Sequence, residues 1–87
     1  MEIINENFNN KMNNPDKIIF QIISRYIDLE TNKLNKNISI ENTPEWDSIA
    51  HMQIVSELSK IYNFELNPEN IMNLNSFSSI KDYLQKL

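Results

Sequence analysis

Apolar residues recur at helical spacing along most of the chain, and no segment shows the sustained alternation that a β-strand requires. The stretch NNPDKIIFQIISRYIDL opens with a strong helix start signal, because Asn14 can cap, Pro15 suits the first turn and Asp16 complements the helix dipole. The pattern predicts a first helix over about residues 15–30. Its apolar face comprises Ile18, Ile19, Ile22, Ile23 and Tyr26.

A second helix is predicted over residues 48–62, with different chemistry on its two sides. We expect Asn63 to end it in the left-handed conformation, a position usually given to glycine, which this chain lacks entirely. The face expected to meet the core consists of Ile54, Val55, Leu58, Ile61 and Tyr62. The opposite, solvent-facing side mixes apolar and polar residues, namely Ile49, Met52, Gln53, Ser56 and Lys60.

Two further helices are predicted near the C-terminus. The sequence NPENIM places Asn67 as the cap of a short helix, and Ser76 is positioned to cap a last one. The apolar stripe of the last helix would consist of Phe77, Ile80, Leu84 and Leu87. The predicted fold is therefore all-α, a small bundle of three main helices plus one short helix.

A long polar connection, residues 31–46, joins the first two predicted helices. Loops of this length in a compact domain are usually functional or fixed by their own apolar residues. The candidates for fixing it are Leu34, Ile38, Ile40 and Trp46. We interpret the Asn-rich residues 1–13 as a mobile tail and residues 14–87 as one domain.

Composition excludes several classes of function. A net charge of −4 argues against nucleic acid and weakly favours basic partners. With no cysteine and a single histidine, a disulfide framework, a thiolate nucleophile and a zinc site are not expected. No apolar run is long enough for a membrane span, and Glu2 stands where a signal peptide would be positive, so we expect a cytoplasmic protein without a membrane partner.

Ser48 stands at the mouth of the predicted second helix, directly after Asp47. Its position alone favours a capping role, which either residue could fill. A helix N-terminus is also a favourable site for an anion, so a phosphate attached to Ser48 would lie in a stabilising field. A catalytic serine is not indicated, because the one histidine, His51, projects toward the core side and no acid is placed to orient it.

The segments WDSIAHMQIVSELSKIYNFEL and NIMNLNSFSSIKDYL make the chain resemble acyl carrier proteins and related carrier domains. The resemblance covers about residues 15–87, including the long loop and the serine at the head of the second helix. Family members attach 4′-phosphopantetheine to the serine of an Asp-Ser-Leu motif, which reads Asp47-Ser48-Ile49 here. The resemblance therefore implies a carrier that is not an enzyme and holds an acyl or aminoacyl group as a thioester.

The resemblance also implies roles for neighbouring residues. Asp47 would help to present Ser48 to a phosphopantetheinyl transferase, and Ile49 and Met52 would dock partner enzymes around the arm. Gln53, Ser56 and Lys60 would complete that partner-binding surface. The partners would be the transferase, a loading ligase or acyltransferase and downstream synthase enzymes, and the carrier itself would be a monomer.

The second helix departs from the acyl carrier pattern in its charge. Fatty-acid carriers usually bear several acids along this helix, whereas here only Glu57 lies between Ser48 and Tyr62. The departure favours a carrier dedicated to one biosynthetic pathway. A general fatty-acid carrier and an unmodified helical interaction module remain alternatives. We interpret Trp46 as a loop anchor packed on the core and His51 as an inner-face residue without a chemical role.

Overall fold

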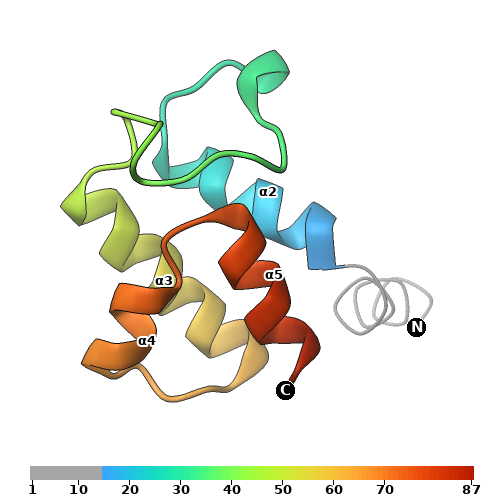
Figure 1. Ribbon diagram of the computed structural model, residues 1–87, viewed down its shortest axis with the longest axis vertical. Helices are drawn as coiled ribbons and strands as arrows, with labels where there is room; N and C mark the ends of the chain where they lie inside the picture. Colours follow the sequence, from blue (N-terminus) through green and yellow to red (C-terminus); the bar gives the residue numbers. More distant parts are fainter. Residues whose placement is uncertain (1–14) are drawn as a thin grey trace.

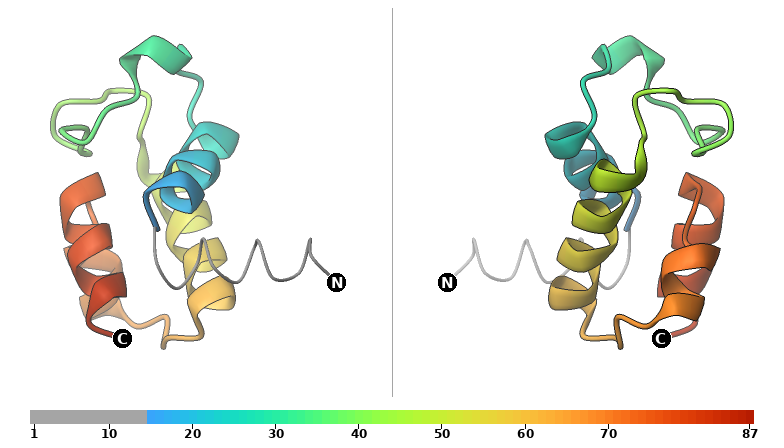
Figure 2. Two further views of the ribbon diagram at one scale, coloured as in Figure 1. Left: turned by 90° about the vertical axis from the view of Figure 1, so that its right-hand side faces the viewer. Right: turned by 90° about the vertical axis from the view of Figure 1, so that its left-hand side faces the viewer.

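The computed structural model describes residues 15–87, which form helices and connecting loops (Figure 1). In chain order the elements are α2 (Pro15–Tyr26), the short 3₁₀ helix η1 (Thr31–Lys33), α3 (Ser48–Tyr62), α4 (Pro68–Asn73) and α5 (Phe77–Gln85). Helix α2 packs against both α3 and α5, and the long loop covers one end of the bundle (Figures 1 and 2). The all-α prediction is confirmed. The predicted tail and the capping role of Asn14 fall on residues outside the described part.

The core is built from the apolar stripes of the helices, as their spacing predicts. Its members from the three longer helices include Ile19, Ile22, Ile23, Ile54, Val55, Leu58, Phe77, Ile80 and Leu84, all buried. Ile18, Tyr26, Ile61 and Tyr62 pack at its margin and are only partly buried. The inclusion of Leu87 was wrong, because α5 ends at Gln85 and this side chain is 61% exposed.

Helix α2 ends at Tyr26, four residues before the predicted boundary. The N–H of Ile27 still donates to the carbonyl of Ile23, at 2.9 Å, but the N–H of Leu29 donates to the carbonyl of Ile27, at 3.0 Å. A bond between residues two apart closes a γ-turn, which diverts the chain from the helix axis. The turn leaves Ile27 in the core, 2% exposed, so burial of this side chain accompanies the early end of the helix.

The other helix limits follow local rules. Helix α3 covers the predicted residues 48–62, and Asn63 ends it in the left-handed region, with φ 58° and ψ 55°. The side chain of Asn67 accepts a hydrogen bond from the N–H of Asn70 at the start of α4. Ser76 caps α5 through a reciprocal pair of bonds with Ser79. All three predicted terminal residues are confirmed, since short-range hydrogen bonding suffices to specify them.

The long loop is fastened to the start of α5 by backbone hydrogen bonds. Ile40 N–H donates to Asn75 O at 3.0 Å, and Phe77 N–H donates to Ile38 O at 3.1 Å. Trp46 and Ile38 are buried beneath the loop, 2% and 5% exposed. Leu34 and Ile40 pack beside them and are partly buried. These side chains confirm the predicted anchors.

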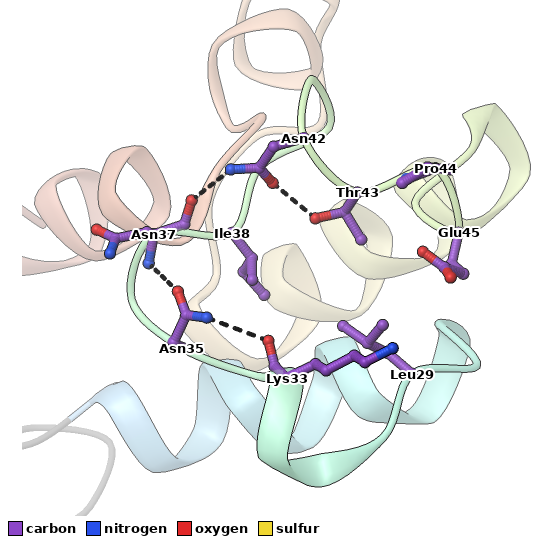
Figure 3. Close-up of a pocket in the computed structure, with 9 residues that line it drawn as sticks. All are labelled: Leu29, Lys33, Asn35, Asn37, Ile38, Asn42, Thr43, Pro44 and Glu45. Atoms are coloured by element: carbon purple, nitrogen blue, oxygen red, sulfur yellow. Dashed lines mark hydrogen bonds between the residues drawn. The ribbon is translucent and has the colours of Figure 1, made fainter.

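Asparagine side chains fix the course of the loop around an open pocket (Figure 3). The amide nitrogen of Asn42 donates to Asn37 O at 2.8 Å, and its amide oxygen accepts from the Thr43 hydroxyl at 2.8 Å. Asn35 Oδ1 accepts from the N–H of Asn37 at 2.8 Å. Such short-range side-chain bonds satisfy backbone groups that would otherwise need a regular ladder. The loop therefore presents Asp47 and Ser48 from a fixed support.

None of the helices within residues 15–87 combines the length and the apolar character needed to cross a membrane.

Candidate functional site: the mouth of helix α3

Asp47, not Ser48, caps helix α3. Asp47 has the extended backbone of a cap residue, with φ −89° and ψ −176°, and its carboxylate accepts a hydrogen bond from Ala50 N–H at 2.9 Å. Its carbonyl accepts from the N–H of His51, also at 2.9 Å. Ser48 is already the first helical residue. The expectation that Ser48 itself caps is therefore wrong, because a capping side chain must belong to the residue just outside the helix.

The Ser48 side chain takes no part in the packing or hydrogen bonding of the described residues. Ser48 is exposed, and its hydroxyl makes no hydrogen bond to any residue of the described chain. It lies at the positive end of the α3 dipole, where N–H groups of the first turn point outward. A primary hydroxyl that is accessible and uncommitted, in a field that stabilises negative charge, fits attachment of a phosphate ester.

The cap can be tested separately from the charge of Asp47. Asp47→Ala is expected to lower the free energy of unfolding by about 0.5–2 kcal/mol, because the N–H of Ala50 loses its acceptor. Asp47→Asn is the matched control and should stay close to wild type, since asparagine caps about as well as aspartate. Urea denaturation monitored by circular dichroism measures both. Equal stability of Asp47→Ala and wild type would show that the cap contributes nothing.

The solvent-facing side of α3 presents the predicted partner-binding residues. Ile49 is 73% and Met52 44% exposed, Gln53 and Lys60 are exposed, and Ser56 is partly buried. All of these except Ile49 line one shallow groove together with Tyr26, Glu57, Ile61 and Leu66. Leu66 was missed by sequence reasoning, because it follows α3 in a connection without periodicity and only the fold brings it alongside.

Glu57, the single acid of α3, is engaged by two residues of α2. Its carboxylate forms an ion pair with Arg25 and accepts a hydrogen bond from the Tyr26 hydroxyl at 2.5 Å. The hydroxyl of Tyr26, and after it the guanidinium of Arg25, lower the pKa of Glu57 against the opposing effect of burial. Lys60 makes no ion pair with any residue between 15 and 87. The outer side of α3 therefore offers a partner little negative charge.

A second pocket opens directly beside Ser48. It is lined by Ile40, Trp46, Asp47, Ser48, His51, Met52 and Ile71. The indole N–H of Trp46 donates to His51 Nδ1 at 3.1 Å, which places the imidazole proton on Nε2, and Nε2 donates to Ile71 O at 2.6 Å. His51 is 7% exposed and both of its ring nitrogens are occupied. The interpretations of Trp46 as an anchor and His51 as an inner-face residue are confirmed.

An exposed serine at the head of an amphipathic helix, in a small helical bundle, is the arrangement that the resemblance to carrier domains predicts. The sequence model of the family described as "Phosphopantetheine attachment site" matches residues 17–84, and the chain belongs to this family of carrier proteins. The prosthetic group is thus a covalently attached 4′-phosphopantetheine, and the protein is a carrier rather than an enzyme.

A curated relative supports the same family. The chain is 26% identical over 73 residues to the "Acyl carrier protein" of Buchnera aphidicola subsp. Schizaphis graminum (strain Sg). The match covers 84% of this chain and 92% of the relative. Carriers of this kind interact with transferases and synthase enzymes in general.

Proposed function

We propose that this protein carries an acyl or aminoacyl cargo in a dedicated biosynthetic pathway, and that Ser48 is the attachment point of its phosphopantetheine arm. The observation that carries the proposal is the exposed Ser48 hydroxyl at the first position of α3, which the Asp47 cap leaves uncommitted. The arm, when bound, supplies a terminal thiol on which the cargo is held as a thioester.

The residues at the N-terminus of α3 would each have a different role in holding the arm. Ser48 Oγ would form the phosphate ester, and the helix N-terminus would stabilise its negative charge. Asp47 fixes the first turn through Ala50 N–H and thereby sets the direction in which Ser48 is presented to the transferase. Ile49 and Met52, both exposed near the start of α3, would supply apolar contacts to partner enzymes.

The low negative charge on the outer side of α3 supports a dedicated pathway over general fatty-acid synthesis. An enzyme that recognises an acidic helix through basic residues would find one carboxylate on α3, already paired with Arg25 and bonded to Tyr26. It would also meet the ammonium of Lys60, which lines the same groove as Met52 and Gln53. Long-range attraction between opposite charges raises association rates, so this surface would be a slow partner for such an enzyme.

Charge substitution tests the choice between pathways. In the holo protein, Gln53→Glu combined with Lys60→Glu is expected to raise the rate of transfer by a generic fatty-acid malonyl transferase or ketosynthase a few-fold. Each exposed pair contributes only roughly 0.2–1 kcal/mol, and the gain should shrink in high salt. The measurement is the transfer rate of wild type and double variant at low and high ionic strength. Efficient transfer to wild type, with no gain from the added acids, would favour the general carrier.

Intact-mass measurement of the protein purified from its own host tests the attachment itself. A gain of one phosphopantetheinyl group, mapped to Ser48 by peptide fragmentation, is the expected result. A chain that stays unmodified in its host, and is also refused by a broad-specificity transferase, would support the unmodified interaction module instead.

We further propose that the carrier acts as a monomer in the cytoplasm. Its core is completed by side chains of one chain, and a chain without cysteine is suited to a reducing compartment. Sedimentation and cell fractionation are the corresponding measurements, and a stable dimer or a membrane-associated pool would contradict this part.

A further inference from the structure

We infer that His51 closes the route from Ser48 into the bundle, so that the cargo is a short acyl or aminoacyl group that stays in the open pocket beside Ser48 or in solvent. The inference rests on the proposed function, because it concerns a cargo attached through Ser48. It goes further by assigning a specificity-determining role to His51 and a size class to the cargo.

The closure consists of one side chain that spans three segments. His51 lies one turn after Ser48 on α3, and its ring reaches Trp46 of the loop on one side and Ile71 of α4 on the other. The donor-to-acceptor distances are 3.1 Å and 2.6 Å. The ring therefore crosses the space between the first turn of α3 and helix α4.

Loss of the two His51 hydrogen bonds would leave one polar group on each side of the ring without its partner. The indole of Trp46 is 2% exposed, so its N–H would lose its acceptor inside the protein. Ile71 is in the last turn of α4, where carbonyls have no donor within the helix, and His51 satisfies this one. None of the residues of α4 is fully buried, and the His51 bond joins this helix to α3 at Ile71, which also packs against the core.

Hydrophobic core residues lie one turn beyond His51. Ile54 and Val55, one turn further along α3, are both 0% exposed, and Leu74 after α4 is 2% exposed. Protein cores of this kind leave little room for an added chain without displacement of side chains. An acyl chain entering between α3 and α4 would have to remove the His51 ring and then separate these residues.

The space in front of His51 remains available. The pocket beside Ser48 has a volume of about 440 Å³ and is open to solvent. Its walls are largely apolar, formed by Ile40, Trp46, Met52 and Ile71, with His51 as its inner limit. This pocket can cover a small apolar group, whereas a long chain would extend from it into solvent.

A series of cargo lengths tests the inference. A broad-specificity transferase and the corresponding coenzyme A thioesters would load acetyl, butyryl, octanoyl and dodecanoyl arms, with loading at Ser48 confirmed by intact mass. In wild type we expect neither the Tm nor the amide ¹H and ¹⁵N resonances of Leu74 and Ile80 to change with chain length. In His51→Ala, the octanoyl and dodecanoyl forms should shift both resonances and raise the Tm, because a chain that binds only the folded state stabilises it. In a domain of this size we expect the Tm of these two forms to rise by about 4–8 °C.

Two variants keep the test decisive. Ile40→Ala enlarges the same pocket but retains the bridge, so its resonances should show no dependence on chain length. Trp46→Phe removes the donor to His51 Nδ1 together with part of the buried indole ring, which loosens the bridge, and it replaces His51→Ala should that variant not fold.

The possible failures are distinguishable. Absence of loading at Ser48 would overturn the proposed function. Loading followed by chain-length-dependent shifts in the wild-type core would overturn the inference alone. An unresponsive His51→Ala and Trp46→Phe would show that His51 is not the barrier.

Discussion

Replacement of Ser48 with alanine is expected to abolish attachment of the phosphopantetheine arm while leaving the fold intact. The hydroxyl makes no hydrogen bond within the described chain, and the cap of α3 is supplied by Asp47. Alanine is also the strongest helix former, so the change should alter the free energy of unfolding by no more than about 0.5 kcal/mol, as is usual for surface positions. Intact mass after incubation with a transferase and coenzyme A measures attachment, and urea denaturation measures stability.

Ser59→Ala provides the matched control, because it removes a hydroxyl from the same helix three turns further along and outside the partner-binding surface. This variant should accept the arm as wild type does. Persistent modification of Ser48→Ala would move the attachment point to another residue, and global unfolding of that variant would contradict the structural freedom assigned to the hydroxyl.

Leu58→Ala is expected to produce the largest loss of stability among the substitutions considered. Leu58 is 0% exposed and belongs to the core face of α3, so truncation removes buried methyl groups and leaves a cavity. The expected loss is about 2–5 kcal/mol in the free energy of unfolding. A loss of this size is a large share of the stability of a small domain, and it is obtained from the denaturation midpoint and the slope m of the urea dependence.

Ile49→Asp is the contrasting change on the same helix. Ile49 is 73% exposed, so the substitution should leave stability nearly unchanged while it impairs transfer to and from partner enzymes. Thermal unfolding and a transfer assay with the phosphopantetheinyl transferase give the two readouts. Similar destabilisation by Ile49→Asp and Leu58→Ala would mean that the two faces of α3 have been assigned incorrectly.

The sequence by itself determined the positions of the helices and indicated Ser48 as the candidate attachment site. Periodicity, Asn63, Asn67 and Ser76 gave α3 its limits and α4 and α5 their starting residues, because capping depends on contacts between residues a few positions apart. The Asp-Ser-Ile motif indicated the family only together with its context, the start of an amphipathic helix after a long loop in an all-helical chain. Where two adjacent residues could each cap, as Asp47 and Ser48 could, composition did not distinguish them, and the answer required the backbone conformation of each.

Only the tertiary structure decided the features that depend on residues far apart in the chain. Helix α2 ends early as Ile27 turns into the core, and Leu87 lies beyond the end of α5 in solvent. Glu57 bonds to Arg25 and Tyr26, which are 32 and 31 residues away in the sequence. The one carboxylate of α3 is therefore already engaged by α2. His51 reaches Ile71 across 20 residues. Helical periodicity specifies which face of a helix is buried, whereas which partners lie opposite that face depends on how the helices pack.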